Sequence, residues 1–178
     1  MSKKRVRRCC LVIDASVAGA AGPLESRHPE SARCRDFLIA VRGICHRMAW
    51  NEALKREWDA NQGAFARQWR LTMVRLKKLQ PVREESLEPL RQAIAEHSPD
   101  QGVIAKMLKD AHLIDAALAA DKRIASKDEN ARGHFGRLLA AYEPLRRIHW
   151  VNPANEAERV VEWLEAGAPL ERARRLRP

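Results

Sequence analysis

The apolar residues of the chain form short unbroken runs separated by longer amphipathic segments, and this alternation predicts an α/β domain. Residues 9–13 are apolar without a break, which is typical of a strand covered on both faces. Shorter strands are predicted at 46–50, 123–128 and 148–151. Parallel strands joined through helices give a three-layer α/β/α fold with a four- or five-stranded parallel sheet.

Apolar positions at intervals of three, four and seven predict the helices between these strands. A loop with room for one short turn of helix is expected at 15–29. Asn51 is an expected N-cap, and Gly63 an expected break in the long helix after it. The predicted helices span 30–45, 52–80, 82–97, 109–121, 129–142 and 156–165.

One domain is predicted over residues 1–169, with a helical insert at about 60–98. Residues 170–178 contain four arginines and are expected to be a frayed basic tail. The apolar run near the N-terminus is cut by Asp14, so it is too short to span a bilayer or to act as a signal core. We therefore expect a cytoplasmic protein without a membrane segment.

The charge of the chain indicates its class of binding partner, and the spacing of its cysteines indicates their role. The chain has 33 Lys plus Arg against 23 Asp plus Glu, a formal net charge of +10, which attracts polyanions such as nucleic acid. A basic surface without a partner is the plainer alternative. The four cysteines form no C-x-x-C pair and are expected to be reduced and structural.

Three aspartates occupy informative places in this pattern. Asp14 and Asp128 each follow an apolar strand, and the carboxyl ends of parallel strands share the edge of the sheet where ligands usually bind. Asp110 heads an apolar helical stripe, since Ile114 lies about 40° and Ala117 about 20° from it on a helix. These three carboxylates are expected to converge.

A fourth acid is expected on the helix that follows Asn51. Glu52 is explained by helix capping, and Asp59 faces solvent, whereas Glu57 flanks Leu54 and can reach inward. Glu57 is therefore the choice, with Glu52, Asp59 and Asp115 left open as substitutes.

Several carboxylates at one point repel one another unless a cation neutralises them, and Mg²⁺ and Mn²⁺ accept such hard oxygen ligands. One or two ions there support in-line hydrolysis of a phosphodiester by an activated water. Each of Asp14, Asp110 and Asp128 has a simpler alternative role as a helix cap or turn residue.

Short motifs in one order resemble those of the PIN-domain nucleases, a family that includes the ribonuclease toxins of bacterial toxin–antitoxin pairs. Glu57 stands in the place of that family's helical glutamate. The other motifs are Val12-Ile13-Asp14-Ala15-Ser16, Asp110 followed by Ala117-Leu118, and Ser126-Lys127-Asp128.

The resemblance implies a single PIN-like domain that binds Mg²⁺ or Mn²⁺ and cleaves RNA. It implies that Ser16 and Ser126 orient carboxylates or contact phosphate. Arg132, one turn into the helix after Asp128, is a further candidate for phosphate, with a surface ion pair as its alternative. The implied catalytic and metal-binding residues are Asp14, Glu57, Asp110 and Asp128.

The leading functional hypothesis is an endoribonuclease, either a toxin or an RNA-processing enzyme. Its expected partners are RNA, an antitoxin protein and a second copy of the chain. The alternative is a catalytically inactive PIN-like module that binds nucleic acid. A phosphatase with an aspartate nucleophile ranks last, because Ser16 stands where that chemistry needs a second acid.

Overall fold

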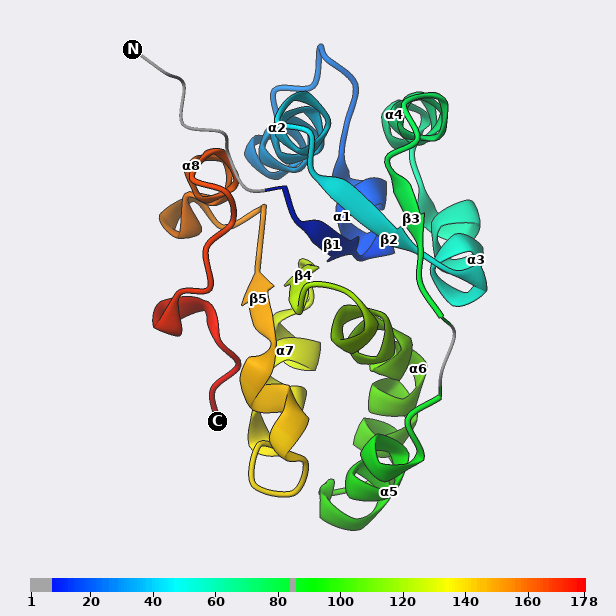
Figure 1. The fold of residues 1–178 in the computed structure, drawn as a ribbon, viewed down its shortest axis with the longest axis vertical. Helices are drawn as coiled ribbons and strands as arrows, with labels where there is room; N and C mark the ends of the chain where they lie inside the picture. Colours follow the sequence, from blue (N-terminus) through cyan, green and yellow to red (C-terminus); the bar gives the residue numbers. More distant parts are fainter. Residues whose placement is uncertain (1–7, 84–85) are drawn as a thin grey trace.

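β1 is the central strand of a five-stranded, all-parallel sheet whose order is β3-β2-β1-β4-β5. The computed structural model describes residues 8–83 and 86–178 and is drawn in Figure 1. The α/β class and the parallel sheet predicted from the sequence are confirmed. The strands are β1 (Cys10–Ile13), β2 (Arg47–Trp50), β3 (Leu79–Pro81), β4 (Arg123–Ala125) and β5 (His149–Val151).

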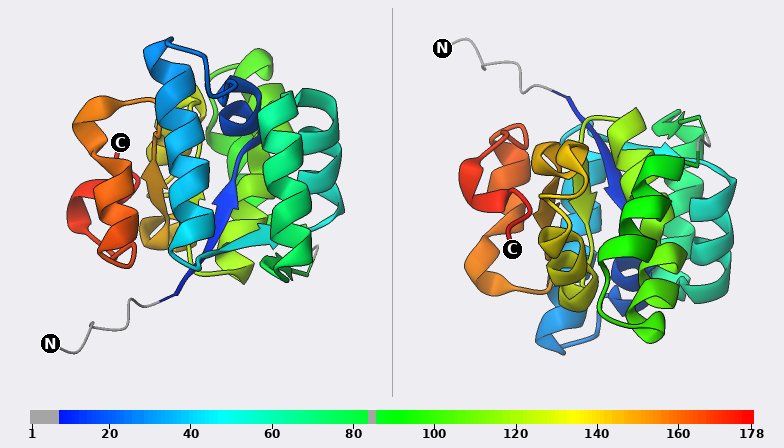
Figure 2. Two further views of the ribbon diagram at one scale, coloured as in Figure 1. Left: turned by 90° about the horizontal axis from the view of Figure 1, so that it is seen from above. Right: turned by 90° about the horizontal axis from the view of Figure 1, so that it is seen from below.

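Helices cover both faces of the sheet, as Figure 2 shows from opposite sides. The helices are α1 (Ala15–Ala20), α2 (Pro29–Gly43), α3 (Glu52–Asn61), α4 (Ala64–Arg75), α5 (Glu88–His97), α6 (Gln101–Ala119), α7 (Glu129–Arg137) and α8 (Val160–Glu165). Leu11 and Ile13 pack with residues of α1, α2, α4 and α8. Val12 packs with residues of α5, α6 and α7. β1 is therefore buried on both faces, which is why its sequence does not alternate.

Three of the turns that lead from a helix into a strand contain a residue other than glycine with positive φ. Cys45, Lys77 and Lys122 have φ of 69°, 55° and 60°. Lys77 ends the run of α4, and β3 begins two residues later. The prediction of a helix up to Pro81 was wrong here, because no glycine marks the left-handed turn at which helices commonly end.

Within the segment predicted as a helical insert, Leu79–Pro81 form β3, which pairs with β2, between α4 and α5. The predicted break at Gly63 is confirmed, because α3 ends at Asn61 and α4 begins at Ala64. Among the helices of the described residues, none has both the length and the apolar character needed to cross a membrane.

The C-terminal segment is packed against the domain, so the prediction of a frayed tail was wrong (Figure 1). Leu176 is buried, and its N–H donates to the carbonyl of Ile148 at 3.1 Å. Arg175 forms an antiparallel bridge with His149 at the start of β5. These contacts help to hold a segment whose arginine content predicted that it would be solvated.

Candidate functional site

Asp14 directly follows β1, and two hydroxyl groups hold its carboxylate. Oδ2 accepts hydrogen bonds from Ser16 Oγ at 2.5 Å and from Ser126 Oγ at 2.6 Å. The Asp14 N–H donates to the carbonyl of Ala125 at 2.9 Å, which ties the end of β1 to the end of β4. Asp14 precedes α1 but forms no side-chain cap there. Its carboxylate is therefore directed to the two serines rather than to the helix.

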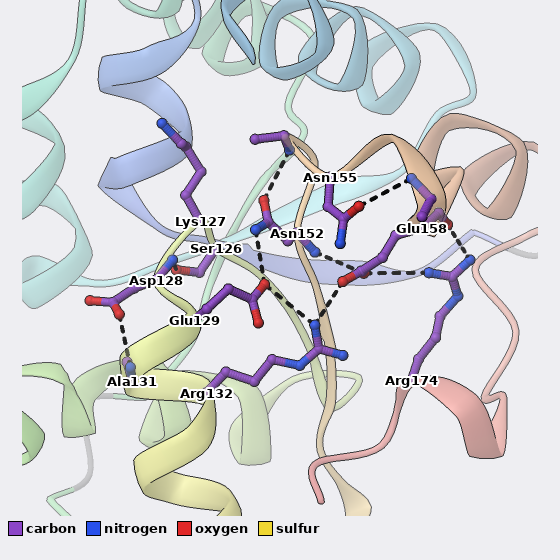
Figure 3. Close-up of polar contacts among 12 residues, drawn as sticks. Ser126, Lys127, Asp128, Glu129, Ala131, Arg132, Asn152, Asn155, Glu158 and Arg174 are labelled. Carbon is purple, nitrogen blue, oxygen red and sulfur yellow. Dashed lines mark hydrogen bonds and ion pairs between the residues drawn. The ribbon is translucent and has the colours of Figure 1, made fainter. Parts of the chain in front are cut away.

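Ser126 joins Asp14 to Asp128. Ser126 is fully buried, and its hydroxyl oxygen accepts the N–H of Asp128 at 3.0 Å. Asp128 caps α7, since its Oδ1 accepts the N–H of Ala131 at 2.8 Å (Figure 3). Its side chain makes no other hydrogen bond to a described residue. The capping alternative for Asp128 is thus correct, and it leaves Oδ2 able to take another partner.

Asp110 lies in the middle of α6, so it is not the cap of that helix. The cap is Asp100, whose Oδ1 accepts the N–H of Val103 at 2.9 Å. Burial raises the pKa of Asp110 to about 6, and the negative charges of Asp128 and Asp14 contribute to the rise. Asp110 is therefore close enough to Asp14 and Asp128, which follow β1 and β4, for the three charges to repel one another.

Glu57 lies half-buried on α3. The indole Nε1 of the adjacent Trp58 donates to the carbonyl of Ile13 at 2.8 Å, which holds α3 against the residue before Asp14. The Glu57 side chain makes no hydrogen bond or ion pair with a described residue. α3 therefore packs beside the end of β1, but Glu57 forms no hydrogen bond with the aspartates.

The acids that the sequence left open as substitutes have other surroundings. Asp59 is exposed and pairs with Arg70 at 2.7 Å. Asp115 is buried, and both of its oxygens accept from Arg91, at 2.9 and 2.5 Å. Glu52 is exposed in the first turn of α3. Asp59 and Asp115 therefore have their charges compensated away from the three aspartates.

Arg132 forms ion pairs with Glu158 at 2.7 Å and with Glu129 at 3.5 Å (Figure 3). Glu158 also accepts the N–H of Asn152 at 2.9 Å. This network joins the first turn of α7 to the segment after β5. The ion-pair alternative for Arg132 is therefore the one that the structure contains, and contact with phosphate requires these pairs to open.

Lys127 is a cation at this edge to which the sequence reasoning gave no role. Its N–H donates to Ser16 Oγ at 3.1 Å, and its ammonium pairs with Glu30 at 2.9 Å. The signal was its place between Ser126 and Asp128. A residue in that loop has its backbone at the carboxyl edge, close to the predicted acids.

The fit of a divalent cation depends on the oxygen atoms at this edge. Asp14, Asp110 and Asp128 offer the hard carboxylate oxygens that Mg²⁺ and Mn²⁺ prefer. Across residues 8–83 and 86–178, however, no group of three or more His, Cys, Asp or Glu side chains is already gathered closely enough to hold a metal ion. The carboxylate oxygens are thus suitable ligands for Mg²⁺ or Mn²⁺. To hold an ion, the site would need water molecules as further ligands, or the carboxylates would have to move slightly closer together.

Comparison with known proteins adds no relative to this picture. A scan against family models, a search of curated proteins and a search of solved structures each found no match.

Proposed function

We propose that this protein is a metal-dependent endoribonuclease. The observation that carries the proposal is the set of three aspartates at the carboxyl edge of β1 and β4, where Ser126 bonds to both Asp14 and Asp128 and their charges act on Asp110. A domain that only binds a polyanion gains nothing from gathering negative charge at a ligand-binding edge.

Asp14, Asp110 and Asp128, with Glu57 from α3, would hold Mg²⁺ or Mn²⁺. When bound, such an ion activates water and stabilises negative charge during phosphodiester hydrolysis. Ser16 and Ser126 fix Oδ2 of Asp14. The α7 cap fixes Asp128 through Oδ1. These contacts set the orientation of two carboxylates before any substrate arrives.

RNA is the proposed substrate because of two independent observations. The net charge of +10 favours a polyanion. The order of the acidic and hydroxyl motifs resembles that of the PIN-domain ribonucleases. The same resemblance makes an antitoxin protein and a second copy of the chain proposed partners. The four free cysteines agree with the proposed cytoplasmic location, since cytosolic thiols stay reduced.

The direct test is cleavage of labelled single-stranded RNA by the purified protein with Mn²⁺, Mg²⁺ or EDTA. Asp14→Asn and Asp128→Asn should each lower the metal-dependent rate at least about 100-fold, the size of effect expected for groups that stabilise developing charge. Asp36→Asn, at an exposed position on α2, is the matched control and should retain activity.

Glu57 is tested separately in the same assay. Glu57→Gln should lower the rate, and Glu52→Gln, five residues earlier on α3, should not. Equal rates for the two variants would remove Glu57 from the proposed site. RNA cleavage that persists in EDTA, or in both aspartate variants, would overturn the proposed mechanism.

A second candidate function is a nucleic-acid-binding module without catalysis. The absence of a ready metal-holding group among the described residues favours it. Calorimetric titration with Mn²⁺ separates the two, because the module would bind RNA while taking up no metal and cleaving nothing.

A further inference from the structure

A hollow lined by arginines lies at the opposite edge of the sheet from the aspartates. The short helices η1 (Glu143–Arg147) and η3 (Arg172–Arg174) and the C-terminal residues surround a hollow of about 670 Å³ beside the start of β5. Four arginines and two leucines contribute most of its wall: Arg146, Arg172, Arg175, Arg177, Leu139 and Leu176. We refer to this hollow as the arginine pocket.

The arginines of the arginine pocket have no ion-pair partner within the described part of the chain. Its four arginines are exposed, and none of them forms an ion pair with a described residue. The acidic residue that precedes Arg172, Glu171, pairs instead with Arg174 at 2.8 Å. No aspartate or glutamate lines the hollow.

His149 forms a bridge with Arg175 of the arginine pocket, and its pKa is lowered chiefly by burial. The charges of Arg175 and Arg123 lower this pKa further, whereas a hydrogen bond to the carbonyl of Arg147 and the charge of Glu171 raise it. Arginines without an ion-pair partner keep their charge available to an external anion.

The arginine pocket is held in shape by the packing of the C-terminal segment. Leu176 is buried, whereas its neighbours Arg175 and Arg177 are exposed, as expected of an extended chain that alternates between inside and outside. Arg174 anchors the segment through a hydrogen bond to the carbonyl of Glu158 at 2.6 Å (Figure 3). The arginines therefore project from a fixed backbone rather than from a mobile tail.

We propose that the arginine pocket binds consecutive phosphates of single-stranded RNA at a site separate from the aspartates. Guanidinium groups match phosphate geometry with paired N–H donors and stack on bases, which lysine does not. Leu139 and Leu176 are buried beneath the arginines and form the floor of the hollow. The choice of RNA rests on the proposed function, whereas the phosphate chemistry rests on the pocket alone.

The test measures the affinity of labelled single-stranded RNA by fluorescence anisotropy in EDTA, so that neither metal nor cleavage enters the result. The Arg146→Gln/Arg175→Gln double variant should bind at least about 10-fold more weakly than the wild type. Its plot of log affinity against log salt should be shallower by about one to two, as expected for two lost phosphate contacts. The matched control is Arg67→Gln/Arg75→Gln, which removes the same charge from exposed positions on α4 and should change affinity less than about 3-fold.

Three outcomes would overturn the proposal: unchanged affinity in the pocket variant, an equal loss in both double variants, or wild-type binding to phosphatidylserine vesicles with none to RNA. Circular dichroism is the control that both double variants are folded. If the Arg146→Gln/Arg175→Gln variant loses RNA binding and the wild type cleaves no RNA, the proposed nuclease is refuted and the proposed RNA-binding role of the arginine pocket stands. If the wild type cleaves RNA and that variant binds RNA as the wild type does, the role of the arginine pocket is refuted and the proposed nuclease stands.

Discussion

Ser126 donates its hydroxyl hydrogen to Oδ2 of Asp14 at 2.6 Å, across 112 positions of sequence. The hydroxyl oxygen of Ser126 in turn accepts the N–H of Asp128 at 3.0 Å. One fully buried hydroxyl therefore sets the relative position of two acids that come from different strands.

Replacing Ser126 by alanine should destabilise the protein by about 1–3 kcal/mol, because the variant loses a buried donor to Asp14 and an acceptor for the Asp128 N–H. Urea unfolding measures the loss of free energy of unfolding. Ser86→Ala, at an exposed position, is the control and should change it by less than about 0.5 kcal/mol. Equal values for the two variants would mean that these hydrogen bonds contribute no net stability.

Asp110 should make the stability of the metal-free protein depend on pH. Burial and then the charges of Asp128 and Asp14 raise its pKa to about 6, well above the ordinary value, so the folded state holds this proton more tightly than the unfolded state does. The contribution of Asp110 is therefore fully present below about pH 4 and is lost as the pH rises to about 6.

Asp110→Asn should consequently be more stable than the wild type at pH 7 in EDTA, by an amount on the order of 1 kcal/mol after allowance for solvent screening. At pH 4 the two proteins should unfold at the same urea concentration. Adding Mn²⁺ at pH 7 should stabilise the wild type more than the variant. A wild type that is the more stable protein at pH 7 in EDTA would contradict the mutual repulsion of the three aspartates.

Removing one partner of the buried ion pair between Arg91 and Asp115 should cost more stability than removing one partner of an exposed pair. Arg91→Leu leaves the Asp115 carboxylate buried without a partner and should lower the free energy of unfolding by about 3 kcal/mol. The double variant Arg91→Leu/Asp115→Leu should recover most of that loss, since it leaves no uncompensated charge. As a contrast, Arg159→Leu disrupts an exposed pair with Glu162 and should cost less than about 1 kcal/mol. A double variant less stable than Arg91→Leu would contradict this account.

Gly136 should be required for docking of the C-terminal segment. A Cβ at this position would lie 1.8 Å from the carbonyl oxygen of Arg177, so Gly136→Ala must move that backbone. Trypsin should then cleave the segment after Arg172 and Arg175 several-fold faster, because its local unfolding becomes easier.

Gly133→Ala is the matched control on the same helix, since a Cβ there would meet nothing within 4 Å. It should stabilise the protein by about 0.5–1 kcal/mol, because alanine favours the helix over glycine. Equal cleavage rates for the two variants would show that the tail is not held against α7.

The sequence could predict β1 and β4 and the acids that follow them because local patterns specify both. An unbroken apolar run marks a buried strand, and the next residue must emerge at its carboxyl end. Asp110 was placed correctly on the inner face of its helix by the 3.6-residue period. Local patterns were thus sufficient to place these three aspartates in the fold, and their binding of a metal stays a prediction.

Other features depend on partners far away in the sequence. The helical period put Asp115 on the side of α6 opposite Asp110, and no local signal shows that Arg91 of α5 meets it there. Lys77 adopts a turn conformation that glycine usually marks, so the end of α4 and the start of β3 were missed. The packing of Leu176 is equally non-local, because a single apolar residue among arginines predicts a solvated tail.

The central position of β1 has a consequence for synthesis of the chain. β2 is made soon after β1 and covers one of its edges, whereas β4 is made only after α6 is complete. During that interval the other edge of β1 is an unpaired row of N–H and C=O groups flanked by apolar side chains, which is a template for pairing with another chain. A nascent chain on the ribosome is therefore most prone to aggregation until Arg123–Ala125 emerges and pairs with β1, and its acidic site is incomplete until Asp128 follows.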